Sequence, residues 1–250
     1  MWRVAPALVL WAGLAACASA PTTAGENANP DPLEPMNRAV FGFNMTVDRA
    51  VLEPTARAYR AIVPGVVRDR IRSFIDNLAE PRIFVNDVLQ GRGDAAGITF
   101  ARFFVNTTAG LAGLFDQATG GGLTRQSGDF GQTLYTWGVA DGPYLVLPFF
   151  GPSNVRDAAG LGVDLYTTPP SSLLGGENAK GVEWGMAVVD GIDQRERNIE
   201  VIEEIKKSAL DLYAHMRSLW RQHRASELRA ARGEAQSPEE LVDPEAPVQR

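Results

Sequence analysis

The chain has 250 residues, of which 45% are hydrophobic and 22% are charged, so it can bury a sizeable core and a wholly disordered chain is excluded. A formal net charge of -6 argues against sequence-independent binding to nucleic acid, because such binding needs a basic face for the phosphates. A single cysteine excludes an intramolecular disulfide and a zinc site built on several thiolates, and two histidines leave little material for other metal sites.

The amino terminus has the layout of an export signal. A basic start at Arg3 precedes the apolar run of residues 4–14, which is too short to span a bilayer. The sequence Leu-Ala-Ala-Cys that ends at Cys17 resembles the lipobox of bacterial lipoproteins. This resemblance implies that the signal peptide, residues 1–16, is removed and that acyl chains are attached to Cys17. The alternative is an ordinary secretory signal cut near Ala20.

After Cys17, the sequence predicts a flexible tether followed by the start of the folded chain. Residues 17–30 are small and polar and lack periodicity, so we expect a flexible tether. Residues 36–52 carry apolar side chains at spacings of three and four, which favours a helix. The alternation between Phe41 and Val47 also fits a strand.

A second amphipathic helix is predicted for residues 67–78, where apolar and charged side chains occupy opposite faces. Pro81 is expected to interrupt this helix, because proline lacks the amide hydrogen that an interior helical position donates. A short third helix then covers residues 85–89, and Gly91 is expected to end it.

Residues 95–115 are almost uncharged, with Arg102 as the one ionised side chain, so a transmembrane helix has to be considered. The cost of inserting Arg102, about 2.5 to 3.5 kcal/mol, offsets most of the gain from the apolar residues. We therefore expect a helix pair packed in protein or lying at a membrane surface. A buried core helix is the alternative.

In the middle of the chain, segments rich in glycine and proline alternate with predicted helices. Residues 120–142 are rich in glycine and are expected to form a loop. Residues 142–152 contain three prolines among apolar side chains, so this segment is not helical and is either extended in a core or presented to a non-aqueous partner. Further helices are predicted for residues 154–166 and 184–191.

The carboxyl-terminal part is predicted to be one amphipathic helix over about residues 196–229. His215 and His223 lie beside its apolar face, two turns apart, and are interpreted as surface or packing residues. A folded helical domain is thus expected for residues 31–230. Residues 231–250 are rich in Glu, Pro and Ser and are expected to form a disordered acidic tail.

Motifs for catalysis are absent. The sequence "DFG" at residues 129–131 is also found in protein kinases. This chain lacks the other kinase motifs that accompany it, which are the glycine-rich loop, the strand lysine and the sequence "HRD". There is no G-x-S-x-G elbow and no Walker loop. We expect no catalytic residues, no metal, no cofactor and no enzymatic activity.

Several long segments resemble the MlaA/VacJ family of outer-membrane lipoproteins. The resemblance covers roughly residues 31–174. It is carried by "DPLEPMNRAVFGFN" (31–44), "VPGVVRDRIRSFIDNLAEPRIFVNDVLQG" (63–91), "ARFFVNTTAGLAGLFD" (101–116) and "DFGQTLYTWGVADGPYLVLPFFGPSNVRD" (129–157). The carboxyl-terminal helix and tail are less distinctive.

This resemblance implies a mainly α fold, a ring-like bundle of short amphipathic helices with Gly/Pro-rich loops, embedded in the periplasmic leaflet of the outer membrane. It implies a channel that removes mislocalised phospholipids from the outer leaflet and maintains lipid asymmetry. The implied partners are phospholipid, a trimeric porin and a soluble periplasmic lipid carrier that feeds an inner-membrane ABC transporter. Ala18 replaces the aspartate that retains lipoproteins in the inner membrane, so outer-membrane delivery is expected. The alternative function is a structural, porin-associated envelope lipoprotein without lipid transport.

A lipid path needs polar groups for the headgroup and apolar groups for the acyl chains. The hypothesis assigns polar roles near the lumen to Asn44, Arg102, Asn106 and Thr107. It assigns acyl-chain contacts to Phe41, Phe43, Leu145, Phe149 and Phe150, for which core packing is the alternative. Gly120, Gly121 and Gly122 are assigned a hinge, for which an ordinary surface turn is the alternative.

Overall fold

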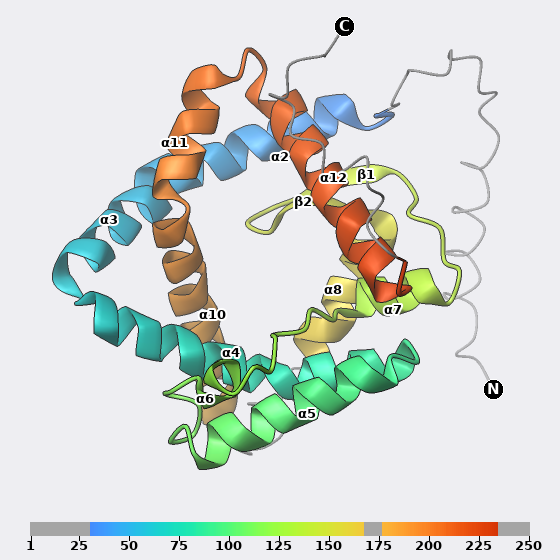
Figure 1. The fold of residues 1–250 in the computed structure, drawn as a ribbon. Coiled ribbons are helices and arrows are strands. Elements are labelled where there is room, and N and C mark those ends of the chain that lie inside the picture. The colour runs from blue at the N-terminus through green and yellow to red at the C-terminus, as the bar shows by residue number, and fades with distance from the viewer. Residues whose placement is uncertain (1–30, 168–176, 235–250) are drawn as a thin grey trace, which may run out of the picture. The chain divides into compact units, whose positions relative to one another are not determined.

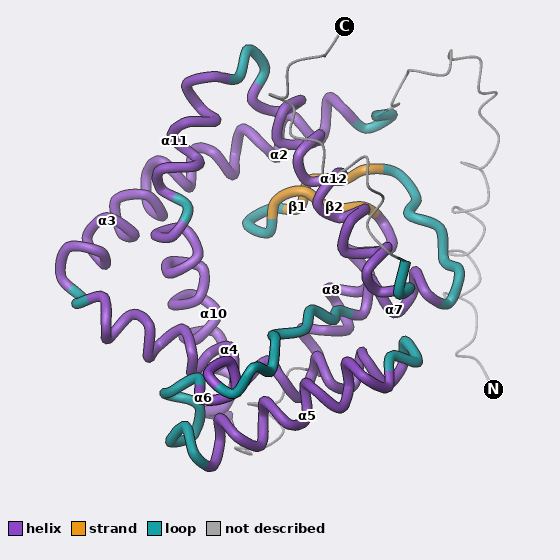
Figure 2. The backbone as a smooth tube through the Cα atoms, viewed as in Figure 1, coloured by secondary structure: helices purple, strands orange, loops and turns teal. Residues whose placement is uncertain are grey.

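The computed structural model describes residues 31–167 and 177–234. The chain divides into two units, Met1–Asp31 and Pro32–Arg250, and the fold below is that of the second. The predicted signal peptide, Cys17, the tether and most of the predicted tail lie outside the described residues. The described part is mainly helical with one small hairpin (Figures 1 and 2).

The elements of this unit follow one another in chain order. They are α2 (Glu34–Val47), the π-helix η2 (Asp48–Leu52), α3 (Glu53–Ile62), α4 (Gly65–Leu89), α5 (Gly93–Thr108), α6 (Gln117–Gly120), α7 (Phe130–Thr136), β1 (Tyr144–Leu147), β2 (Gly151–Asn154), α8 (Val155–Thr167), α10 (Glu177–Arg197), α11 (Ile199–Ser208) and α12 (Leu212–Ala231).

Contacts between these elements close a circuit (Figure 1). From α2 the chain runs through η2 into α3, α3 packs against α10, α10 against α4, α4 against α7, and α7 against α8. The hairpin completes the circuit, because α8 contacts both strands and β1 packs against α2. The expected ring-like helical bundle is confirmed, with α5 packed on α4 and α12 packed on α7.

The helix predicted for residues 36–52 is confirmed as α2 and η2, and the strand alternative is wrong. The interruption at Pro81 is also wrong, since α4 runs unbroken through this residue. A proline inside a helix costs about 3 kcal/mol. Packing against α5, α7 and α10 and buried polar contacts on both sides of Pro81 offset that cost.

The stretch 95–115 forms α5 followed by tight turns. None of the described helices combines the length and apolar content needed to cross a bilayer. On α5 the buried positions are small or polar, and its aromatic side chains Phe100 and Phe104 face outward. The expectation of a packed or surface-lying helix therefore fits better than that of an ordinary apolar core helix.

The proline-rich segment 142–152 avoids helix as predicted and forms the antiparallel hairpin β1–β2. Tyr144 and Val146 point inward and form a small apolar core with Tyr213 of α12. Asn37 of α2 is fully buried beside them. Its Nδ2 donates to the carbonyl of Tyr144 at 3.0 Å, and its Oδ1 accepts from the amide of Val146 at 2.9 Å. One side chain of α2 therefore fixes the strand that closes the circuit.

The single long helix predicted for residues 196–229 is wrong, because three helices share this region. The helix α10 ends at Arg197, α11 ends at Ser208, and α12 begins only at Leu212. Asp211 explains the second break, since its carboxylate accepts from the amide of Ala214 at 3.2 Å and caps α12. Such a cap stabilises a new helix start by about 1 kcal/mol.

Other predicted boundaries also shift. The expected loop 120–142 contains the helix α7, capped by Asp129, whose carboxylate accepts from the amide of Gln132 at 2.8 Å. The predicted helix 154–166 is confirmed as α8, and the predicted helix 184–191 lies inside the longer α10. Glycines let α7 and α8 approach closely, because a Cβ on Gly160 would lie 2.4 Å from the backbone nitrogen of Gly131.

Candidate lipid-handling site

The distribution of side chains in the described unit is inverted relative to a water-soluble protein. Its most completely buried large side chains are polar or charged, led by Arg102, Gln132, Glu80 and Asn37. Large apolar side chains are exposed on nearly every helix. On α5, Phe100 and Phe104 are 57% and 59% exposed, whereas Arg102 is 2% exposed. Soluble proteins keep charges outside, so this pattern suits an apolar surrounding.

Arg102 organises the polar contact between α4, α5 and α6. Its Nε lies 2.9 Å from Oε1 of Glu80, and its Nη2 lies 3.3 Å from the carboxylate of Asp116. Its Nη1 donates to the hydroxyl of Thr119 at 3.0 Å. Burial raises the pKa of Glu80 more than the hydrogen bond and charge of Arg102 lower it. The contacts of the buried Arg102 guanidinium therefore join α4, α5 and α6.

Asn106 extends this group. Its side chain donates to Asp116 at 3.0 Å and accepts from the amide of Ala118 at 2.9 Å. Burial tends to raise the pKa of Asp116, but hydrogen bonds from Thr119 and Asn106 lower it to about 2. Arg102 and Asn106, both predicted to face a lumen, are thus bound into a network that holds α6 on α5. Their contact with lipid stays a prediction.

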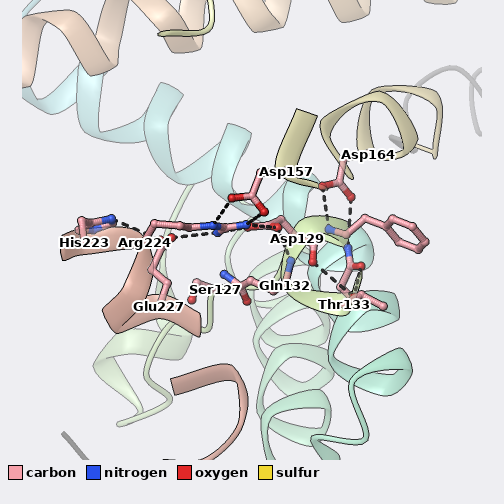
Figure 3. Close-up of polar contacts among 12 residues, drawn as sticks. Ser127, Asp129, Gln132, Thr133, Asp157, Asp164, His223, Arg224 and Glu227 are labelled. Carbon is pink, nitrogen blue, oxygen red and sulfur yellow. Dashed lines mark hydrogen bonds and ion pairs between the residues drawn. The ribbon is translucent and has the colours of Figure 1, made fainter. Parts of the chain in front are cut away.

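Arg224 of α12 forms a second polar centre (Figure 3). Its guanidinium lies 2.7 Å from Asp129 and 2.9 Å from Asp157, and it also reaches Glu227 at 3.0 Å. Burial alone would raise the pKa of Asp129, but the hydrogen bonds and charge of Arg224 outweigh it and lower that pKa. Asp129 caps α7 and Asp157 lies in α8, so one arginine ties α12 to both helices.

The tip of the hairpin carries exposed aromatic side chains. Phe149 is 72% exposed, and its ring packs edge-on against that of Phe43 of α2 at 5.4 Å. Asn44 holds the tip in place, since it donates to the carbonyl of Leu147 and accepts from the amide of Phe149, each at 2.9 Å. The structure therefore brings Phe43, Asn44 and Phe149 together, and their contact with lipid stays a prediction.

The remaining predicted site residues are dispersed. Phe41 is half-buried against Tyr213, Leu145 is half-buried in β1, and Phe150 is exposed beside Phe149. Thr107 is exposed at the end of α5 and accepts a hydrogen bond from Asn77 at 3.0 Å.

The glycines predicted as a hinge end α6. Gly122 has φ of +84°, a conformation that favours glycine, and this geometry is compatible with the hinge and with the surface turn alike. His215 and His223 are exposed, as expected for surface residues. Among the described residues, no cluster of His, Cys, Asp and Glu is suited to a metal ion.

Sequence reasoning missed a cavity of about 420 Å³ beside α7, here called the α7 cavity. The side chains that matter chemically in its wall are Arg82, Arg125, Ser127, Asp129, Gln132 and Glu227. A second cavity of about 190 Å³ also borders Arg82, and its wall includes Val85, Leu89, Phe130 and Val163. Two residues of the first cavity wall, Asp129 and Gln132, belong to the sequence "DFGQ", but Arg82 and Glu227 are distant from it in the sequence.

Comparison with known proteins identifies the family. The sequence model described as MlaA lipoprotein matches residues 29–227. A Haemophilus influenzae protein named "Intermembrane phospholipid transport system lipoprotein MlaA" is 34% identical over 222 residues, which cover 87% of this chain and 86% of that protein. The Escherichia coli K12 protein of the same name is 39% identical over 151 residues, 59% of each chain.

Two further similarities agree. An uncharacterised protein of Rickettsia felis is 36% identical over 197 residues, which cover 79% of this chain and 76% of that protein. A solved structure reported as "Structural basis for maintenance of bacterial outer membrane lipid asymmetry" matches with a TM-score of 0.70 and 34% identity, covering 80% of this chain and 100% of that one. From its sequence and its fold, this chain belongs to the MlaA lipoprotein family.

Proposed function

We propose that this chain is an envelope lipoprotein that takes part in intermembrane phospholipid transport and thereby maintains the lipid asymmetry of the outer membrane. The relatives named for that transport system and the solved structure concerned with that asymmetry support this function. The observation on the chain itself that carries the proposal is the inverted distribution of side chains, with polar groups buried and large apolar groups exposed.

The physical argument concerns solvation. A phospholipid headgroup is costly to move through hydrocarbon, because its charges lose their hydration. A ring with apolar side chains outside can lie among acyl chains, and polar groups within it can solvate a headgroup. Since the described helices include none that could span a bilayer, we propose that the ring lies in one leaflet.

The finer placement is also a proposal. We propose that acyl chains on Cys17 anchor the chain in the periplasmic leaflet of the outer membrane, and that a trimeric porin holds it there. A soluble periplasmic carrier would then receive the lipid and feed an inner-membrane ABC transporter. The lipid leaves chemically unchanged, so the chain is not an enzyme, and lipid masses before and after passage should be identical.

Within the path, we propose that Phe43, Phe149 and Phe150 contact acyl chains, supported by their exposure at the hairpin tip. Arg102 and Asn106 act indirectly, because their hydrogen bonds fix α6. Gly120 ends α6, and we propose that it forms the hinge together with Gly121 and Gly122.

The test uses a strain that lacks this chain. Without it, phospholipid should accumulate in the outer leaflet, where a membrane-impermeant amine reagent labels it, and detergent resistance should fall. Wild-type chain should restore both. The double variant Phe100→Glu/Phe104→Glu should not, because it places two charges on the exposed apolar face of α5.

The matched control is Ser218→Glu/Gln222→Glu. These residues have the same spacing of four on α12 and are also exposed, but they are polar already. The control should complement fully. Normal outer-leaflet composition in the strain without the chain would refute transport and favour the alternative, a structural porin-associated lipoprotein.

A further inference from the structure

The α7 cavity contains an unused acceptor. Gln132 is 1% exposed, and its Oε1 accepts no hydrogen bond from any described residue. A buried acceptor without a partner is costly, and such groups are rare in native proteins. Gln132 lines the cavity, and because the last torsion of a glutamine is soft, its amide can adjust to a bound ligand. A ligand that brings an N–H group would satisfy it.

The same cavity offers cations for an anionic group. Arg125, on the segment between α6 and α7, is partly exposed and its guanidinium pairs with Asp76 of α4. Arg82 lies 3.2 Å from Asp164 and also reaches the carbonyl of Gly128. Each guanidinium has more donors than these partners use, and arginine suits phosphate because it can donate two parallel hydrogen bonds.

The wall also carries carboxylates. Asp129 and Glu227 line the cavity, and each is bonded to Arg224. The wall therefore presents both cations and carboxylates, each already paired with a neighbour, and a zwitterion can bind to both kinds of group without adding net charge. A volume of about 420 Å³ lies within the range of small-molecule sites. The fitting ligand therefore has a phosphate, a cationic end and an N–H donor.

We propose that the α7 cavity binds the phosphoethanolamine group of a phospholipid and discriminates against phosphocholine, with Gln132 as the discriminating residue. The phosphate lies against Arg82 and Arg125, and the ammonium lies between Gln132 and the carboxylates. A trimethylated nitrogen has no N–H and leaves Gln132 unsatisfied. The second, mostly apolar cavity that shares Arg82 gives room for apolar parts of the same lipid. This assignment rests on the proposed function, since it takes the headgroup from a lipid.

The test is binding of short-chain lipids by the full-length protein in a non-ionic detergent, followed by calorimetry. Four dihexanoyl lipids carry phosphoethanolamine, its N-methyl and N,N-dimethyl forms, and phosphocholine, so the number of N–H donors falls from three to none. We expect the first three to bind with similar affinity and phosphocholine about tenfold more weakly, the size expected for one unmade buried hydrogen bond. An even decline with each methyl group would point to ligand size and overturn the proposal.

Variants separate the two halves of the site. Gln132→Leu should erase the tenfold difference, while Gln222→Leu on the exposed face of α12 should preserve it. Arg125→Gln should weaken all four lipids about tenfold, because it removes a phosphate contact that they share. Asp76→Asn breaks the same ion pair but keeps the cation, so it should cause no loss. Unchanged circular dichroism establishes that each variant is folded.

Three results would overturn the proposal. The first is equal affinity of the wild type for phosphoethanolamine and phosphocholine lipids. The second is a preference that survives Gln132→Leu. The third is equally tight binding of free phosphoethanolamine, which would assign the cavity to a soluble compound. Each of these leaves lipid transport intact if the wild-type chain still restores outer-leaflet composition in cells, whereas failure of that complementation removes the transport function itself.

Discussion

Replacing Arg224 with methionine should destabilise the ring. The variant removes the cation from Asp129 and leaves this carboxylate without its ion-pair partner, whereas Asp157 keeps its pair with Arg156 at 2.8 Å. Breaking a buried ion pair from one side costs about 3 to 5 kcal/mol. Because Asp129 is partly exposed, we take the lower end, about 3 kcal/mol. For a domain of this size, that corresponds to a fall in Tm of about 6 to 12 °C.

The assay is thermal unfolding of the full-length protein in detergent, followed by far-ultraviolet circular dichroism. Arg221→Met is the control, because this exposed arginine lies one turn earlier on α12 and should change stability by less than about 0.5 kcal/mol. Adding Asp129→Asn to Arg224→Met should recover part of the loss, because it removes the carboxylate that the variant leaves without an ion pair. An Arg224→Met variant as stable as Arg221→Met would refute the role given to Arg224 in holding α12 on α7 and α8.

The ion pair between Arg224 and Asp129 should also make the stability of the protein depend on pH. Arg224 lowers the pKa of Asp129 in the folded protein below its usual value, although burial acts in the opposite direction. A carboxyl group with a lowered folded pKa stabilises the protein above its unfolded pKa and loses this effect as pH falls through the folded pKa. The difference in Tm between wild type and Arg224→Met should therefore be largest near neutral pH and shrink below about pH 4. A difference that stays constant over this range would contradict the assignment.

Three further outcomes follow from local geometry. Asn37→Ala should cost about 2 to 4 kcal/mol of unfolding free energy, because two buried backbone groups of β1 lose their partner. A Tm within about 2 °C of wild type would contradict this. Gly160→Ala should destabilise, since its Cβ would meet the backbone of α7, whereas Gly162→Ala on the same helix, with open space around it, should stabilise by about 0.5 to 1 kcal/mol. Equal effects of the two would refute the close approach of α7 and α8. Phe149→Gly relieves a φ of +67° but also removes the ring contact with Phe43, so two effects of about 1 kcal/mol each should nearly cancel and leave the Tm in detergent unchanged; a large shift in Tm would contradict this.

Sequence periodicity located the helices well where the local pattern was strong. Residues 36–52 and 154–166 are helical as predicted, because the spacing of their apolar residues marks one face of a helix, although much of that face is exposed. The predicted interruption at Pro81 is wrong, because tertiary packing offsets the free-energy cost of a proline inside a helix. The prediction also failed at Asp211, where one side-chain cap begins a new helix inside a continuous apolar pattern.

The buried polar residues could be predicted less well from the sequence. Residues 142–152 are non-helical as predicted, because the effect of proline on the backbone is a local property. The residues that line the α7 cavity with Gln132 are not local, since Arg82 and Glu227 come from helices far away along the chain. Periodicity also assigns apolar faces to the inside by default. Only the structure reveals that Phe100 lies outward and Arg102 inward.

The exposed aromatic side chains of α5 and the hairpin also bear on how the protein reaches its membrane. In water, exposed apolar surfaces of this kind promote association with other chains. If the chain works at the outer membrane, as we propose, it would be prone to aggregate while it crosses an aqueous compartment. Its biogenesis would then require either folding that finishes only at the membrane or an escort that covers these side chains in transit.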